Sequence, residues 1–391
     1  MKKLLTFLFL IVNFCTWAQN IDLTILVKDS QTKLPIADVS ILAMEIKKSG
    51  LTNKEGVFKL SVKQHVTLEF EHANYQSIYI NTSLLTEKLN VIYLEPADKL
   101  LDEIVITKAP PKDVLAEVIE NSINTLTNPI ALKVYVLEFY KKNGIYSSFN
   151  DGLLDFYISG KGSKPKSDII VEQNRFYGLV EPDIWGNTVG YNLNNLIENY
   201  YGFTYLNKVI QNRAEKKYEY LIKTYPAHKE YYVMYINAKE EVAEALPNFE
   251  IIYDFTKKLI VDIKSTIPKE KLQYAKIDNF NITKGYVLYS DFRATYKING
   301  KLYHLASSKE EVGVHQTTKK DAPDKIEVKN YFVINDVNTE SFNYNKKNVF
   351  TGKSLININT SFFYNYWDFN SGLSPTTEEL EIISILAGND E

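Results

Sequence analysis

The segment from residue 20 to residue 97 alternates apolar and polar side chains with the period of two that is typical of half-buried β-strands. The clearest runs cover residues 21–27, 58–62, 66–70 and 89–93. Turn signals lie between the runs; in Asn53-Lys54-Glu55-Gly56 the glycine can adopt a positive φ. Several short strands separated by turns predict a small β-sandwich over residues 20–97.

Longer amphipathic strands dominate the remaining region, residues 113–391. Apolar and polar side chains alternate through YVLYSDFRATYKI, residues 286–298, and Asn299-Gly300 then predicts a two-residue type I′ hairpin turn. Long antiparallel strands with one polar face suit a curved sheet packed on helices. The sequence therefore predicts a mainly β protein, in which a small β-sandwich is followed by a larger antiparallel β domain, an open sheet or half-barrel with a few helices.

Three segments of the larger region carry helical patterns instead. Apolar residues recur at helical spacing from Val114 to Leu126, with Asp113 as the expected N-cap. Residues 193–200 and 377–386 are the other two, and the last begins with a capping box at Thr376–Glu379. By pattern alone this layout resembles the lipoprotein-carrier half-barrel class. A transmembrane barrel would alternate similarly, but the charged loops and the C-terminal helix favour the open sheet.

One part of the N-terminal segment matches a known domain family. VKDSQTKLPIADVSI followed by GLTNKEGVFKL resembles the carboxypeptidase regulatory-like domain, a transthyretin-like sandwich common at the front of exported proteins of Bacteroidota-type bacteria. The resemblance implies an accessory sandwich without peptidase activity, and Lys33 stands where the family usually has glycine. The matching positions are Asp29, Thr32, Pro35, Ile36, Ala37, Val39, Thr52, Asn53, Gly56 and Phe58.

Residues 1–18 have the features of a secretory signal peptide. Lys2 and Lys3 precede an apolar run, and small residues ending in Ala18 precede the expected cleavage site. Cleavage removes Cys15, the only cysteine, so the mature chain could form neither a disulfide nor a thiolate metal site. It also takes the formal net charge from -3 to -5, which argues against nucleic acid as a partner. We expect an exported protein, in the periplasm or associated with the outer membrane, without a transmembrane helix.

The chain offers few groups arranged for catalysis. None of its five histidines begins an H-x-x-E or H-E-x-x-H motif, so the ligands of a zinc carboxypeptidase are missing. Nucleophile-elbow, P-loop and dinucleotide-binding motifs are missing too. We therefore expect no catalytic activity, no metal and no cofactor, with an uncharacterised hydrolase as the enzymatic alternative.

Residues 98–112 connect the two regions and contain the run LDEIVIT. This run resembles the segment that precedes the plug of TonB-dependent outer-membrane receptors, which a partner binds as an added strand. The rest of the chain is too short for the plug and barrel of such a receptor. Two interpretations stay open: a connecting strand that pairs with its own protein before Pro110, and a strand that pairs with an envelope protein partner. The residues of the second interpretation are Asp102, Glu103, Ile104, Val105, Ile106 and Thr107.

Two tryptophans are candidate ligand contacts. Trp185 lies in the loop-like stretch EPDIWGN, and Trp367 lies in the aromatic run SFFYNYWDFN. Aromatic rings can stack on the faces of sugars, so a glycan ligand is one hypothesis, and burial of alternate rings in the core is the other.

Three hypotheses of function follow from these patterns. The leading one is a non-enzymatic exported cell-envelope protein with a binding or assembly role at the periplasm or outer membrane. The alternatives are a carrier of a lipid or other apolar ligand in a concave β-sheet, which predicts an apolar cavity, and the hydrolase.

Overall fold

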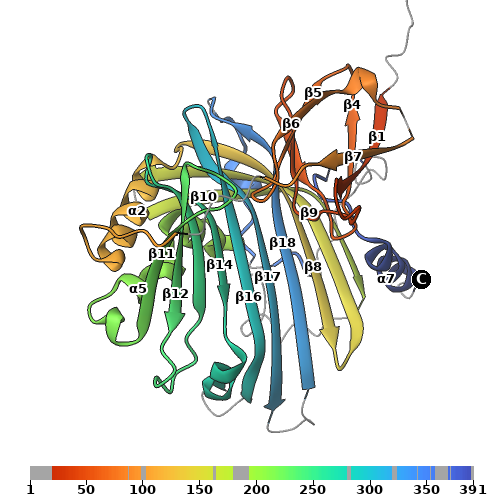
Figure 1. Ribbon diagram of the computed structural model, residues 1–391. Coiled ribbons are helices and arrows are strands. Elements are labelled where there is room, and N and C mark those ends of the chain that lie inside the picture. Colours follow the sequence, from red (N-terminus) through yellow and green to blue (C-terminus); the bar gives the residue numbers. More distant parts are fainter. Residues whose placement is uncertain are drawn as a thin grey trace, which may run out of the picture.

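The computed structural model describes residues 20–86, 88–97, 103–161, 164–178, 193–279, 283–318, 324–340, 342–352, 354–356, 369 and 371–388. The fold is mainly β, as predicted. A small module of two sheets is followed by a large, curved antiparallel sheet that is open on one side, with few helices (Figure 1). The expected signal peptide lies outside the described residues, as do Asp102, Trp185 and Trp367.

Residues 20–97 form two small sheets that share one core. Alternate residues such as Ile25, Phe58 and Phe70 point into this core, as the period of two requires. Strands β1 and β7 are parallel, and the other pairs are antiparallel. The first sheet has the order β4-β1-β7 and consists of Ile21–Asp29 (β1), Val57–Val62 (β4) and Leu89–Leu94 (β7). The second has the order β3-β2-β5-β6 and consists of Ser40–Ala43 (β2), Lys48–Leu51 (β3), Thr67–Glu71 (β5) and Ile78–Asn81 (β6), with Thr82–Leu84 (η1) after it.

The large sheet has the strand order β10-β9-β8-β18-β17-β16-β14-β13-β12-β11, with β15 paired to β16 beside this path. A hairpin joins β16 and β17 at the predicted place, but its turn residues are Gly300 and Lys301. Only Gly300 has a positive φ there, whereas a type I′ turn needs two such residues. The strands are Ile130–Lys142 (β8), Ile145–Lys161 (β9), Lys164–Gly178 (β10), Tyr218–Thr224 (β11), Tyr231–Ala238 (β12), Asn248–Asp254 (β13), Leu259–Thr266 (β14), Lys276–Asn279 (β15), Thr283–Asn299 (β16), Leu302–Thr318 (β17) and Asp324–Asn338 (β18).

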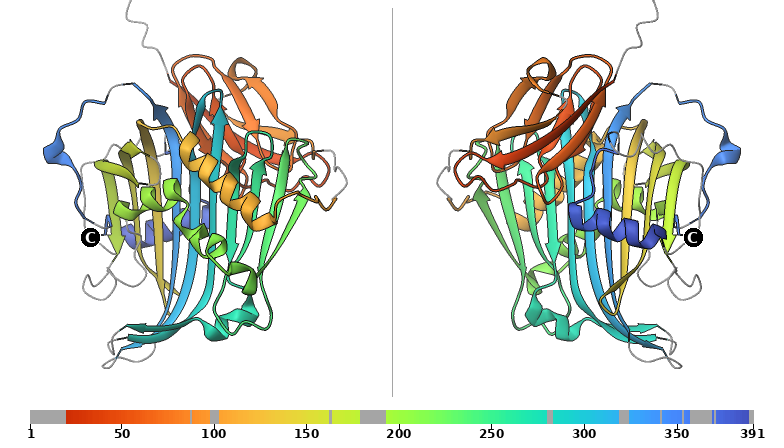
Figure 2. Two further views of the ribbon diagram at one scale, coloured as in Figure 1. Left: turned by 90° about the vertical axis from the view of Figure 1, so that its left-hand side faces the viewer. Right: turned by 90° about the vertical axis from the view of Figure 1, so that its right-hand side faces the viewer.

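Helices cover part of the concave face of the large sheet (Figure 2). Their apolar side chains join those of the sheet in the main core, which contains Leu115, Ile197 and Leu132. The first of these helices begins at Pro111, so the expected N-cap, Asp113, lies in its first turn instead; proline at the first helical position favours this start. The helices are Pro111–Thr125 (α2), Leu193–Gly202 (α4), Thr204–Leu206 (η2), Asn207–Ile210 (α5) and Ala214–Lys216 (η3), and Lys269–Tyr274 (η4) and Lys346–Asn348 (η5) lie elsewhere.

The convex face of the same part of the sheet is covered by the N-terminal module and by helix α7, Thr377–Gly388 (Figure 2). The predicted capping box is confirmed, because Glu379 accepts a hydrogen bond from the Thr376 N–H and Thr376 accepts one from the Glu379 N–H. Strand β8 is therefore buried on both faces, with Val134 in the main core and Tyr135 in the core under α7. Burial on both faces explains why VYVLEFY is apolar at almost every position.

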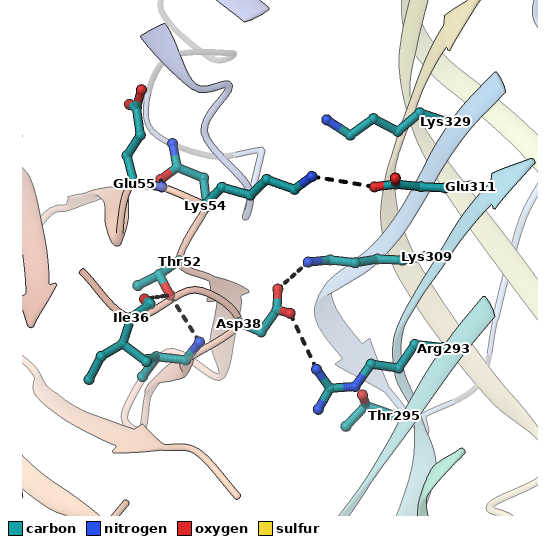
Figure 3. Close-up of polar contacts among 12 residues, drawn as sticks. Ile36, Asp38, Thr52, Lys54, Glu55, Arg293, Thr295, Lys309, Glu311 and Lys329 are labelled. Carbon is teal, nitrogen blue, oxygen red and sulfur yellow. Dashed lines mark hydrogen bonds and ion pairs between the residues drawn. The ribbon is translucent and has the colours of Figure 1, made fainter. Parts of the chain in front are cut away.

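The module contacts the convex face through its edge strand β3. The Leu51 N–H donates to the Gly372 carbonyl at 2.7 Å, and Ser49 Oγ donates to the Ile334 carbonyl at 2.9 Å. A Cβ atom on Gly50 would lie 2.2 Å from the Gly372 oxygen, so only glycine permits this approach. Charged side chains of the two parts also meet, including Lys54 and Glu311 at 3.5 Å (Figure 3).

Candidate functional site

The concave face of the large sheet carries a second apolar cluster, away from the helices. Strands β8, β16, β17 and β18 continue past the helices towards the end of the sheet that is farthest from the module (Figures 1 and 2). Within the described residues, every member of this cluster belongs to the sheet itself. We call it the distal patch, and it consists of Tyr140, Val287, Val312, Val314, Ile326 and Val328.

The opposite face of these strands is polar. Lys325 and Glu327 alternate with Ile326 and Val328 on β18, and their charged groups pair at 3.1 Å on the convex side. The distal part of the sheet thus has one polar and one apolar face, as expected for an antiparallel sheet with water on one side. The apolar face points into the concavity.

A row of polar side chains separates the distal patch from the main core. In the register of the strands, Asn150 of β9 stands opposite Glu138 of β8. Glu138 also stands opposite Asn330 of β18, on its other side. Asn330 in turn stands opposite Glu310 of β17. Cross-strand partners project from the same face of a sheet, so the four side chains lie side by side in the concavity. We call these four residues the acceptor row.

The two amides of the acceptor row are directed at its two carboxyl groups. Asn150 Nδ2 donates a hydrogen bond to Glu138 Oε1 at 2.8 Å, and both residues are buried. Burial raises the pKa of Glu310, and a hydrogen bond from Asn330 offsets part of that effect. The row is thus rich in hydrogen-bond acceptors in an environment that disfavours charge.

At the margins of the distal patch, three polar atoms are buried without a hydrogen-bond partner in the described part of the protein. They are Asn330 Oδ1, in the row, and Ser148 Oγ and Gln316 Oε1, on either side of the distal patch. A buried polar group that lacks a partner costs about 1–3 kcal/mol, so native proteins rarely leave one unpaired. Gln316 lies six residues along β17 from Glu310, so the three atoms are spread around the patch, and Asn330 Oδ1 is the one that a polar group bound at the row would satisfy.

Aromatic rings close the site on the side of the main core. Phe292, the next residue across the sheet from Glu310, stacks with Tyr200 of α4 at a centroid distance of 5.9 Å. Tyr205 packs against the same ring at 4.7 Å. The site is therefore amphipathic: a polar row at a closed end, and an apolar surface that extends from it.

The described part of the LDEIVIT segment, residues 103–107, lies elsewhere, along the edge of β11. The Val105 N–H donates to the Ile222 carbonyl at 2.9 Å, and the Thr224 N–H donates to the Glu103 carbonyl at 2.9 Å. Residues 103–105 therefore pair with their own protein. The side chains of Ile104 and Ile106 are 65% and 94% exposed. A partner strand would have to use the outer edge of this segment, where the backbone groups of Ile104 point.

The sequence alone does not identify the residues of the acceptor row, because the pattern that marks them is faint. Glu138 stands within VYVLEFY, and Asn330 stands at the start of NYFVIN, as isolated polar residues in otherwise apolar strands. A polar residue at an inward position of a strand is the signal that could have found them. No sequence pattern around these two positions indicates that their side chains meet those of Asn150 and Glu310.

A small cavity between the module and the large sheet is the other candidate. Its volume is about 120 Å³, and its lining includes Asp38, His72, Asp262, Arg293 and Lys309. Sites for small organic ligands usually measure about 300–1,000 Å³, so this one suits a few water molecules. Its charges already pair with each other: Asp38 pairs with Arg293 and Lys309 across the interface, and Asp262 pairs with Arg293 within the sheet.

The residues that the structure describes contain no group of three or more histidine, cysteine, aspartate or glutamate side chains that could hold a metal ion. None of their helices has the length and apolar character needed to cross a membrane.

Comparisons with known proteins add little. No family model and no curated protein matches the chain. Among solved structures, lipovitellin, described with its lipid–protein interactions, gives a TM-score of 0.25 at 8% identity over 60% of this chain. A LolA-superfamily protein from Nitrosomonas europaea gives 0.21 at 7% identity over 59% of this chain and 94% of its own. The chain spans only 27% of the lipovitellin chain, and scores this low carry no argument about its ligand.

Proposed function

We propose that this protein binds an amphipathic, largely apolar molecule such as a lipid against the distal part of its concave sheet. The observation that carries the proposal is the combination of an inward-facing apolar patch with unpaired polar atoms at its margins. This proposal adopts the carrier hypothesis in preference to a purely structural or assembly role.

The energetics favour a ligand with both characters. Tyr140, Val314, Ile326 and Val328 are already buried, so an apolar chain would gain mainly by covering the half-buried Val287 and Val312, at about 25 cal/mol for each Å² buried. A hydrogen-bond donor at the row satisfies Asn330 Oδ1, which costs about 1–3 kcal/mol if left unpaired. A purely apolar molecule would gain the first contribution and leave the second cost in place.

The signal peptide and the module set the compartment in this proposal. A chain that is exported to the periplasm or to the outer membrane meets lipids there. The carboxypeptidase regulatory-like module would then serve to fix the large sheet, since it covers the convex face and leaves the concave face to the ligand.

The proposal can be tested on the full chain with Nile red, a neutral apolar dye whose fluorescence rises on binding. We expect saturable binding, and mass spectrometry of a solvent extract of the purified protein should show a co-purified lipid. Val314→Trp, which fills the patch, should weaken dye binding at least tenfold, and the milder Val314→Thr several-fold.

The matched control is Ile145→Trp, because Ile145 is 73% exposed near the distal end of β9. It should bind the dye as the natural protein does. Thermal melts show whether each variant is folded. Folded variants at Val314 that bind the dye with unchanged affinity would refute the proposal.

A further inference from the structure

The acceptor row also indicates which kind of polar group the ligand carries. We infer that Glu310 and Asn330 select a ligand whose headgroup donates hydrogen bonds and has no negative charge, as an amine or a hydroxyl does. This inference rests on the proposed function and specifies its ligand class. It excludes fatty acids and other ligands with an anion at the polar end.

First, within the row, the hydrogen bonds run from the amide groups to the carboxyl groups. Each amide NH2 group faces a carboxyl group of the row, as Asn150 does at 2.8 Å. At Glu310 and Asn330 what remains is acceptor capacity: the amide oxygen of Asn330 only accepts, and Glu310, once it ionises, accepts at two oxygens and donates nothing. An anionic headgroup would place acceptor against acceptor.

The second step is the unpaired amide oxygen. Asn330 is only 4% exposed, and its Oδ1 has no hydrogen-bond partner, while its amide nitrogen is engaged by Glu310. The residue lies between two glutamates on the same face. A buried acceptor in that position requires a donor, which is an observation independent of the two acids.

The third step is the distribution of positive charge. Lys309 and Lys329, which adjoin Glu310 and Asn330 in sequence, project from the convex face, where they pair with Asp38 and Glu379. No cation contributes to the shifted pKa of Glu310. Among the residues that the structure describes, no cationic side chain is placed to neutralise an anion at the row. An ammonium group, in contrast, would be held there by charge-assisted hydrogen bonds.

The dimensions fit a head-and-chain molecule. From Asn330 to Ile326 along β18 the sheet extends about 14 Å, at roughly 3.4 Å for each residue. With its headgroup at the row, an extended acyl or alkyl chain of about this length would run along the distal patch. The chain would leave the row towards the open end of the sheet, away from Phe292.

Three single-chain probes of equal length test the inference: hexadecylamine, hexadecanol and palmitate, each at submicellar concentration in competition with Nile red. We expect the amine and the alcohol to displace the dye at least tenfold more effectively than palmitate. Glu310→Gln, which preserves size, should reduce the advantage of the amine over palmitate by about tenfold.

Glu311→Gln is the matched control, because Glu311 is adjacent in sequence but faces Lys54 on the convex side. It should leave all three affinities unchanged. Equal or tighter binding of palmitate by the natural protein would overturn the headgroup inference and leave the carrier proposal intact. Failure of all three probes and of Nile red to bind would overturn the carrier proposal itself.

Discussion

Asp38 of the N-terminal module lies between Arg293 and Lys309, which come from the neighbouring strands β16 and β17 of the large sheet. Its Oδ2 accepts a hydrogen bond from Arg293 Nη1 at 3.3 Å, and its Oδ1 pairs with the Lys309 ammonium group (Figure 3). Thr52 shapes the loop that presents this carboxylate, because its Oγ1 accepts the Val39 N–H at 2.9 Å. One side chain of the module thus bridges two strands of the sheet.

Asp38→Asn should loosen this contact without distorting the loop. Asp38 has a φ of 62°, which asparagine tolerates well, so the change removes mainly the charge. We expect the free energy of unfolding to fall by about 1–2 kcal/mol, the cost of hydrogen bonds to a charged group. Urea denaturation measures that loss, and trypsin should cleave faster after Lys108, in the exposed segment that joins the module to α2.

Lys54→Met provides the comparison for that experiment. Lys54 and Glu311 form a more exposed ion pair across the same interface, and such pairs contribute about 0–1 kcal/mol. If Asp38→Asn changes stability no more than Lys54→Met does, the Asp38 bridge does not hold the module in place.

His72 makes the same interface sensitive to acid. Burial and the nearby Arg293 charge lower its pKa from 6.5 to about 4, and its Nδ1 accepts the Asn74 N–H at 3.1 Å, as a neutral ring can. The unfolded chain binds this proton more readily, so stability is present above pH 6.5 and is lost as the pH falls from 6.5 towards 4. The loss amounts to at most about 3 kcal/mol.

His72→Asn should flatten this part of the stability curve. Asparagine does not titrate and can accept the same N–H two residues on, as in an Asx-turn. Denaturation midpoints measured between pH 4 and pH 7 for both proteins give the difference. Parallel curves would mean that His72 keeps an ordinary pKa in the folded protein.

Strand β8 shows how far the sequence predicts this fold. The alternation through residues 286–298 identifies a strand, and the signal at Asn299-Gly300 places its hairpin to within one residue. In β8, from Val134 to Leu137, such alternation is missing, because helices cover one face and α7 with the module covers the other. Local sequence does not encode which distant element covers which face.

The acceptor row shows the same limit for the site. Its members come from two pairs of consecutive strands that are distant from each other in sequence, β8 with β9 and β17 with β18, and their alignment depends on the register of each pairing. A shift of one residue would turn a strand's polar side chain to the convex face. The segment around Val105 was conspicuous because it is a continuous motif, whereas the row exists only once β8, β9, β17 and β18 have paired.

Val105→Pro tests the structural role of the connecting strand. Proline removes the N–H that donates to Ile222 and leaves that carbonyl without its partner, so we expect a loss of about 1–3 kcal/mol in unfolding free energy. Ile106→Ala, at a side chain 94% exposed, should cost almost nothing. If instead Val105→Pro folds as stably as the natural protein and loses capture of an envelope partner, the segment serves mainly as an added strand.

Glu310→Gln should raise stability while it weakens binding of the amine probe. Burial raises the pKa of Glu310, so the folded protein holds this proton more tightly than the unfolded chain does. Ionisation therefore lowers stability as the pH rises from about 4.5 through the raised pKa. Glutamine keeps the size and cannot ionise, so the midpoint of thermal unfolding should rise by a few degrees at pH 7 and stay unchanged at pH 4. Glu311→Gln should show neither effect. A destabilised Glu310→Gln at pH 7 would instead mean that the carboxylate supports the fold, whereas a stabilised one shows that it is kept for binding despite its cost.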